Sequence, residues 1–442
     1  MKKFVTTIKN IFSIEELRNR ILATLGFLII FRLGSFVVLP GIDPVILEAT
    51  KGESSGILGI LDNLLGGAFS NGAIFGLGIM PYISASIVIQ LMTVAVPSFQ
   101  KMQKEGESGR KKLTQITRIL TILVTLAQSV GYLKVTIPSE AIVIDNTLFT
   151  ISSMILLTSG TMFCMWLGEK ITDKGIGNGI SMLIMIGIIS SLPAAAINEF
   201  IFTNGISRAL FSVVELIVLF FVVLVTVALV QATRRISVQY AKQVVGGKVY
   251  GGQRQFIPLK VNASGVMPII FAQALMILPT LIGGIWADSS DFWNKVTVAF
   301  ADPYGATYNI VFAIMIILFT FFYTAITVNP SNMADDLKRS GGFVPGVKPG
   351  KPTSDFIGGV LDRITLPGSV FLAIIAILPT FAVQAGVGQA FALFYGGTSL
   401  LIMVGVILDT LQQIESYLLM RHYEGMMKSG KMRGRSQGVA VA

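Results

Sequence analysis

The residue types that most often carry catalysis or hold metal ions are scarce in this chain. Cys164 is the single cysteine and His422 the single histidine among 442 residues. One cysteine cannot form a disulfide within the chain, and one histidine without clustered carboxylates does not make a zinc or di-iron site. That histidine lies in a basic tail, where it cannot complete a Ser, His and Asp catalytic set. We therefore expect a protein that is not an enzyme and has no metal or other cofactor.

A nucleotide-binding loop is not expected either. The nearest approach is "VPGVKPGKPTS" (344–354), where Pro345 replaces the glycine that a phosphate-binding loop needs five residues before Gly350. Any energy from nucleotide hydrolysis must then come from another protein.

Ionisable residues inside apolar segments usually mark a pathway for ions or substrates. Here there are three, Arg32, Glu215 and Asp409, which is few for a proton-coupled or sodium-coupled transporter. Arg32 is expected either to pair with backbone carbonyls or a partner subunit, or to reach the membrane interface as a structural residue. Asp409 is expected at a helix end.

A stripe of isoleucines is the more informative pattern. In "GLGIMPYISASIVIQL" (76–91), Ile79, Ile83 and Ile87 recur every four residues and share one face of a helix. β-Branched isoleucines are stiff, and a ring of them around a narrow neck excludes water and ions without recognising any sequence. The spacing alone leaves open what this face contacts, and Pro81 is expected to bend the helix.

The composition shows what must position this stripe. Hydrophobic residues make up 53% of the chain and charged residues 13%, with a mean hydropathy of +0.73, which is typical of a membrane protein. The amphipathic first 20 residues do not resemble a cleavable signal peptide. Ten apolar runs are long enough to cross a bilayer: 21–39, 73–96, 114–133, 147–167, 178–196, 209–230, 264–286, 307–328, 367–385 and 391–411. We expect an all-α polytopic membrane protein with ten spans.

The distribution of Lys and Arg predicts the orientation. Of the 34 basic residues, 29 fall on the side that carries both termini. The opposite side has only Lys51, Lys134, Arg208 and Lys295. By the positive-inside rule both termini are cytoplasmic.

Ten spans divide into two halves of five, so the second half starts from the opposite side and any internal repeat is inverted. The predicted halves are 1–196 and 209–442, joined by a hinge at 197–208. "IMPYI" (79–83) and "VMPII" (266–270) lie in the second span of each half, and such corresponding Pro-interrupted spans point to a translocation path.

Three connecting segments are longer than connection requires. The loop 231–263 carries six basic residues and no acidic one, and its "GGKVYGG" predicts a hairpin outside the membrane. The loop 329–366 is rich in Gly and Pro. Either loop could merely fix the topology, but two such loops favour a docking surface for an anionic partner. "GILGILDNLLGGAFSNG" (56–72) is too short to cross the membrane, which leaves a re-entrant half-helix or an amphipathic surface helix.

Six long motifs resemble the SecY family, whose members form the Sec protein-conducting channel. The motifs occur in family order: "GLGIMPYISASIVIQLMT", "KEGESGRKKLTQITR", "MWLGEKITDKGIGNGIS", "PLKVNASGVMPIIFA", "NPSNMADDLKRSGGFVPGVKPGK" and "GGTSLLIMVGVILDT". The resemblance covers nearly the entire chain. It implies two inverted five-helix halves around an hourglass pore that opens sideways to lipid, with a short plug helix at about 57–65.

The resemblance also assigns residues to three parts of the channel. The implied pore ring consists of Ile79, Ile83, Ile180, Ile184, Ile270 and Ile402. The implied lateral gate carries the polar residues Ser84, Gln128 and Asn262. The apolar residues of the implied plug are Ile57, Leu58, Ile60, Leu61, Leu64 and Leu65.

The partners that the resemblance implies are the small membrane subunits SecE and SecG, the SecA motor ATPase, the ribosome, signal peptides, unfolded precursor proteins and membrane lipid. The implied docking residues on the two cytoplasmic loops are Lys248, Arg254, Lys338, Arg339 and Lys348. Lys348 stands where the family commonly has arginine, so the charge is kept and the planar fork is lost. The implied location is the plasma (inner) membrane of a bacterium.

The sequence thus predicts a passive channel for secretory polypeptides, driven by a motor or the ribosome, that also releases apolar segments into lipid. A secondary transporter of a small solute is the alternative, since it would share inverted repeats and broken helices. Few intramembrane charges, an apolar constriction and large basic loops favour the channel. An intramembrane hydrolase lacks a paired catalytic set.

Overall fold

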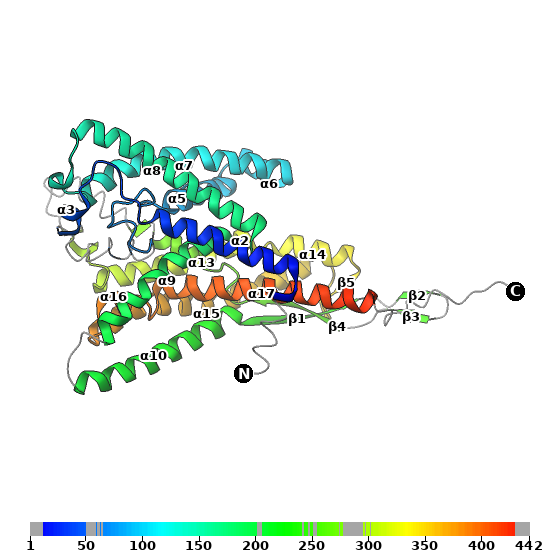
Figure 1. Ribbon diagram of the computed structural model, residues 1–442. Helices are drawn as coiled ribbons and strands as arrows, with labels where there is room; N and C mark the ends of the chain where they lie inside the picture. Colours follow the sequence, from blue (N-terminus) through cyan, green and yellow to red (C-terminus); the bar gives the residue numbers. More distant parts are fainter. Residues whose placement is uncertain are drawn as a thin grey trace.

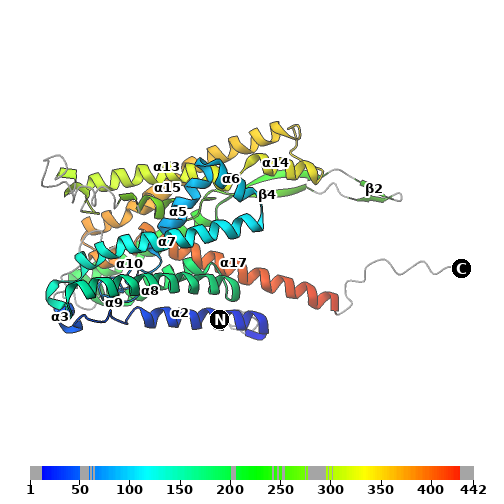
Figure 2. The same cartoon turned by 90° about the horizontal axis from the view of Figure 1, so that it is seen from above.

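Long helices lie side by side and form a bundle (Figures 1 and 2). The computed structural model describes residues 12–49, 59, 62, 65–200, 206–240, 243–245, 248–250, 254–273, 275–276, 295–296, 298–300 and 302–428. In both views the sheet strands, α6, α14 and the C-terminal end of α17 lie at one end of the bundle, and α3 lies at the other. We call these the strand end and the far end.

The N-terminal half consists of helices that alternate in direction. Its elements are α2 (Glu15–Gly34), α3 (Pro44–Ala49), α5 (Met80–Ala95), α6 (Pro97–Lys104), α7 (Glu107–Thr136), the 3-10 turn η1 (Ser139–Ala141), α8 (Asn146–Lys174) and α9 (Gly179–Phe200). α5 packs against α7, α7 against α8, and α8 against both α9 and α2. A buried apolar group around Leu39, Leu133 and Phe149 holds their far ends together.

The C-terminal half contains both helices and strands. Its elements are α10 (Ile206–Gln231), β1 (Thr233–Tyr240), β2 (Gln243–Val245), β3 (Lys248–Tyr250), β4 (Arg254–Lys260), α13 (Ala306–Thr327), α14 (Pro330–Arg339), β5 (Gly342–Phe343), α15 (Lys351–Gln384), α16 (Gln389–Ala392) and α17 (Gly397–Lys428). α13 packs along α15 around Ile316 and Leu372. The halves meet where α9 packs against α17, α16 and α10.

The described helices are consistent with the ten predicted spans. Seven of the described helices are long and apolar enough to cross a membrane, and α5 with α6, bent by 98°, makes an eighth. α2 covers most of the predicted first span. Residues 267–273 and 275–276 are helical, and the rest of the predicted seventh span lies outside the described residues.

Several predicted span boundaries are wrong. The second span was expected from residue 73, but α5 begins only at Met80, after a series of turns. Pro81 lies in the first turn of α5, so it starts the helix and does not bend it. The ninth helix begins at Lys351, sixteen residues before the expected start at 367, because its polar first turns carry no hydropathy signal. The tenth was expected from 391, yet α16 ends at Ala392 and α17 starts at Gly397.

Asp409 was expected at a helix end and instead lies inside α17, where it is exposed. The predicted hinge at 197–208 is only partly described. α9 continues to Phe200, α10 begins at Ile206, and residues 201–205 lie outside the described residues.

The two long loops at the strand end form one folded body. β1 and β4 pair antiparallel and β2 pairs with β3, which confirms the predicted hairpin. β5 pairs with β1 through Gln239 and Phe343, so the second loop adds a strand to the sheet of the first. Val238, Leu337 and Ile357 bury one core between this sheet, α14 and α15. We call this body, 233–260 with 330–364, the loop unit. The sequence did not predict this joining, because the paired strands are about a hundred residues apart.

Candidate functional site

The six isoleucines of the predicted ring come together from both halves of the chain. Ile79 and Ile83 lie just before and within α5, Ile180 and Ile184 in the first turns of α9, Ile270 in the helix that starts at 267, and Ile402 in α17. All six belong to one apolar cluster at the centre of the bundle. Three are buried, at 3% exposure for Ile79, 8% for Ile83 and 3% for Ile402, and the other three are partly buried.

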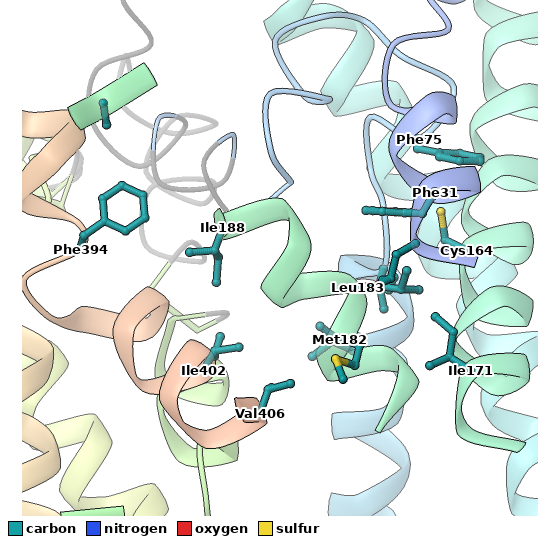
Figure 3. Close-up of a cluster of buried hydrophobic side chains, with 14 of the residues drawn as sticks. Phe31, Phe75, Cys164, Ile171, Met182, Leu183, Ile188, Phe394, Ile402 and Val406 are labelled. Carbon is teal, nitrogen blue, oxygen red and sulfur yellow. The ribbon is translucent and has the colours of Figure 1, made fainter. Parts of the chain in front are cut away.

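This central cluster extends beyond the ring into both halves. Its other buried members are Leu28, Phe31, Phe75, Cys164, Leu167, Ile171, Met182, Leu183, Ile188, Ala195, Ala382, Val387, Phe391, Ala392, Phe394, Tyr395 and Val406. Figure 3 shows α17, with Ile402 and Val406, facing α9, which carries Met182, Leu183 and Ile188. Among the described residues, the buried members of this contact between the two halves are apolar apart from Tyr395 and Cys164, and the Tyr395 hydroxyl donates to the Glu215 carbonyl.

The helix of Ile79 and Ile83 and the helix of Ile270 begin with the same local structure. In "GIMP" (78–81) and "GVMP" (265–268) a glycine with positive φ, +51° and +64°, precedes the helix, and the proline falls in its first turn. The amide of Ile83 donates to the carbonyl of Ile79 (3.0 Å), and the amide of Ile270 to that of Val266 (3.4 Å). The echo between the halves is therefore a repeated helix start.

Val266 is a member of this site that the ring assignment left out. It takes the place of Ile79 in the repeat and packs against the central cluster. A Cβ atom at Gly405 of α17 would lie 3.6 Å from its Cγ1. The paired motifs were the signal that could have found it.

The end of the predicted plug lies beside the ring. Leu65 is buried and packs with Ala68, Ala73 and Met80, the first residue of α5. Of the other plug residues, Ile57, Leu58, Ile60, Leu61 and Leu64 lie outside the described residues. A side chain at Gly78 would collide with Leu65, so the plug end sits directly against the turn that positions Ile79.

Arg32 holds the chain just after the plug. Its Nη1 donates to the carbonyl of Gly66 over 2.6 Å, and its guanidinium lies 4.6 Å from the centre of the Phe36 ring. Gly66 has φ +64°, and a Cβ atom there would lie 2.9 Å from both that Nη1 and the Gly187 carbonyl of α9. Of the alternatives for Arg32, pairing with a backbone carbonyl is the one observed.

Further hydrogen bonds fix the same segment to the N-terminal half. Asp62 accepts from the amide and the hydroxyl of Ser70, both at 2.9 Å. The Tyr132 hydroxyl of α7 donates to the carbonyl of Phe69 over 2.8 Å. The residues that follow the predicted plug are thus anchored by hydrogen bonds.

The predicted gate residues lie on three different segments. Ser84 donates to the carbonyl of Met80 within α5 (3.1 Å), and Gln128 is exposed on α7. Asn262 is buried and accepts from the Ser264 hydroxyl (3.2 Å). The described hydrogen bonds do not join these three residues to one another.

The predicted docking residues lie on the loop unit and its hairpin. Lys248 is in β3 and Arg254 in β4. Lys338 and Arg339 are exposed in the last turn of α14, and Lys348 is exposed in the turn before α15. Lys348 is fixed through its backbone, because its carbonyl accepts from the Thr353 hydroxyl over 2.8 Å.

No group of three or more His, Cys, Asp or Glu side chains that could hold a metal ion occurs within the described part of the chain. Cys164 is fully buried in the central cluster. The described residues thus provide a buried apolar cluster from both halves and, at the strand end, the exposed cations Lys338, Arg339 and Lys348.

The family model described as SecY matches residues 73–411. Among curated proteins, the protein translocase subunit SecY of Mycobacterium bovis is 40% identical over 448 residues, covering 97% of this chain and all of the relative. The protein of the same name from Streptomyces scabiei is 42% identical over 446 residues, covering 96% of this chain and all of the relative.

Solved structures give the same fold at low identity. A structure described as a protein conducting channel aligns with a TM-score of 0.63 and 17% identity, over 90% of this chain and 92% of that one. A SecY protein whose description concerns the plug domain aligns at 0.58 and 16% identity with the same coverage. Sec61 in the canine ribosome-channel complex also aligns at 0.58, with 17% identity and the same coverage.

Proposed function

The chain belongs to the SecY family, and from this premise we propose which of its residues form the pore, the plug, the lateral gate and the docking face of a protein-conducting channel. It is the pore-forming subunit of a protein translocase, a multi-pass membrane protein that passes unfolded polypeptides across the bilayer and is not itself an enzyme. None of the relatives named above is described as a small-solute transporter.

The convergence of six isoleucines carries the proposal. They come from segments spread between residues 79 and 402, from both halves, and meet in one apolar cluster. Stiff apolar side chains at a narrow neck favour dewetting, which blocks water and ions at rest. Because they bind no particular sequence, they can also close around any extended chain. We assign Ile79, Ile83, Ile180, Ile184, Ile270 and Ile402 as the pore ring, and add Val266.

The plug and the gate complete this assignment. Residues 57–65 would close the pore from one side, and the Arg32 bond to Gly66 would hold the base of that plug. Ser84, Gln128 and Asn262 would line the lateral exit, through which an apolar segment of about 20 residues partitions into lipid. The hinge on which the halves part would be the connection 197–208.

The loop unit is the proposed docking face for partners that supply energy. Its sheet, α14 and the start of α15 share one core, so the exposed Lys338, Arg339 and Lys348 are presented on a rigid body. Lys248 in β3 and Arg254 in β4 are proposed as further docking residues. The ribosome, with its anionic RNA, and the SecA motor are the proposed partners. The ribosome-channel complex among the solved relatives supports the first of these.

The small subunits SecE and SecG are proposed as membrane partners from the family assignment. α2 starts and α17 ends at the strand end of the bundle (Figures 1 and 2). With 29 of 34 basic residues predicted on that side, both termini would be cytoplasmic in the plasma membrane of a bacterium.

A photo-crosslinker at position 83 tests the pore directly. A secretory precursor stalled in mid-transit by the motor should form an adduct at Ile83 and none at the matched position Ile119, an isoleucine of α7 that is 63% exposed. Absence of the adduct at position 83 while the precursor is protected from protease would place the path elsewhere.

A further inference from the structure

The turn between α8 and α9 is buried and is held by three different helices. Residues 175–177 are buried, although they connect two spans. The amide of residue 175 donates to α8 (2.8 Å), that of residue 176 to Thr24 Oγ1 of α2 (3.0 Å), and that of residue 177 to Gln413 Oε1 of α17 (2.8 Å). Buried amides need such partners, and here each partner comes from a separate element.

The approach of α17 to this turn is close. Gly177 has φ +83°, and a Cβ atom there would lie 3.1 Å from Thr410 Oγ1 of α17. Beside it, Arg20 of α2 lies over the Tyr417 ring of α17, with 5.4 Å between its Cζ and the ring centre. We call Thr24, the turn 175–178 and Gln413 the 177–413 clasp.

The clasp joins the two halves, and its turn directly precedes the two pore-ring residues of α9. Thr24 and the turn belong to the N-terminal half, whereas Gln413 belongs to the C-terminal half. α9 begins at Gly179, so Ile180 and Ile184 lie in its first two turns. The Asn178 side chain accepts from the Ile180 amide over 3.1 Å. On α17, Ile402 lies three helical turns before Gln413.

We propose that Gln413 and Thr24 are positioning residues for the pore ring, an inference that rests on the ring proposed above. Gln413 fixes the start of α9 relative to α17, and Thr24 fixes it relative to α2. As long as both bonds hold, Ile180 and Ile184 stay in the same apolar cluster as Ile402. A partner that displaces the strand end of α17 breaks the Gln413 bond and loosens the ring, without touching any isoleucine.

The test compares substitutions at position 413 in the complete channel complex, reconstituted into planar bilayers and free of motor or ribosome. Gln413→Leu removes the acceptor and should raise the resting ion conductance about fivefold or more, because it leaves a buried amide unpaired. It should also speed deuterium exchange in 175–180. Gln413→Glu keeps an acceptor and should behave as the unmodified channel. Gln412→Leu, at the exposed neighbour, is the matched control.

Thr24→Val breaks the clasp from the α2 side and replaces Q413L if that variant does not assemble. Unchanged conductance and exchange in both variants would overturn the proposal. Faster exchange with unchanged conductance, while Ile402→Ala leaks, would also overturn it, because the clasp would then not position the ring. If Ile402→Ala does not raise the resting conductance, the pore-ring assignment is wrong. Deuterium exchange in 175–180 then tests only whether Gln413 and Thr24 hold the turn.

Discussion

At the residue scale, an isoleucine of the ring and an isoleucine facing lipid differ only in their surroundings. Ile29 and Ile119 are 59% and 63% exposed on the outside of the bundle, whereas Ile79 and Ile402 are each 3% exposed at its centre. An apolar side chain fits both on the outside of the bundle and at its centre. At the centre, however, its volume would set the width of the proposed constriction.

Shortening the ring should open it. Ile83→Ala and Ile402→Ala together remove buried volume from opposite halves, and we expect a rise in resting conductance of about tenfold, with some loss of stability from the cavity. Single-channel recordings without a partner measure this. The conservative pair Ile83→Val and Ile402→Val should remain nearly closed. An alanine pair as tight as the valine pair would show that other residues form the constriction.

Arg32 should hold the plug through its carbonyl bond. Arg32→Leu leaves the Gly66 carbonyl without its donor, at a cost of about 1.5 to 3 kcal/mol for a hydrogen bond to a charged group. We expect faster protease or thiol-reagent access to 57–65 and a several-fold higher resting leak. Arg32→Lys should keep part of the effect. Arg18→Leu, on an exposed turn of the same helix, controls for lost charge, and an equal leak in that variant would refute the role of the bond.

At the element scale, the loop unit is stabilised by contacts that neither loop makes alone. β5 contributes only Gly342 and Phe343 to the sheet, yet it places α14 over the strands. Asn329 caps α14 by accepting from the amides of Ser331 (3.0 Å) and Asn332 (3.3 Å). The basic last turn of α14 also suits the negative end of the helix dipole.

Removing the cap should loosen the docking face without affecting the pore. Asn329→Ala should destabilise α14 by about 1 kcal/mol, seen as faster amide exchange in 330–339 and weaker binding of the partner. Resting conductance should not change. Asn329→Asp keeps the capping oxygen and should bind normally. Slower or equal exchange in the alanine variant would contradict this account.

At the scale of the whole molecule, the two ends of the helix bundle differ in structure. The strand end carries the loop unit and its exposed cations, and the central cluster, proposed above as the pore ring and its surroundings, lies between the halves. Docking at one end can therefore act on the ring only through helices that reach both places. α15 is such a helix, since it contributes Ile357 and Leu361 to the core of the loop unit and Ala382 to the central cluster.

Charge reversal at the two ends should separate docking from topology. Lys338→Glu with Arg339→Glu should weaken binding of the motor or ribosome about tenfold at low salt, and less at high salt, because exposed charges are screened. Lys134→Glu, an exposed lysine at the far end of α7, is the control and should leave binding unchanged. The opposite pattern would mean that the far end is the cytoplasmic one.

The sequence by itself determined the class of the protein and the hairpin, and its ten predicted spans are consistent with the described helices. Hydropathy and charge are local properties, and the membrane imposes them on each span separately. α8, α9, α10 and α13 begin within about three residues of the predicted starts. α7 and α15 extend further because their polar turns leave the membrane and carry no hydropathy signal.

Only the tertiary structure decided which isoleucines meet, that β5 joins β1, and that Gln413 holds the turn at 177. These contacts join residues that are far apart in the chain, and an apolar side chain gives no local sign of whether it faces lipid or a neighbouring helix. Pro81 illustrates the limit. Read alone it predicted a bend, but the glycine turns before it and the packing against Leu65 make it the start of a helix.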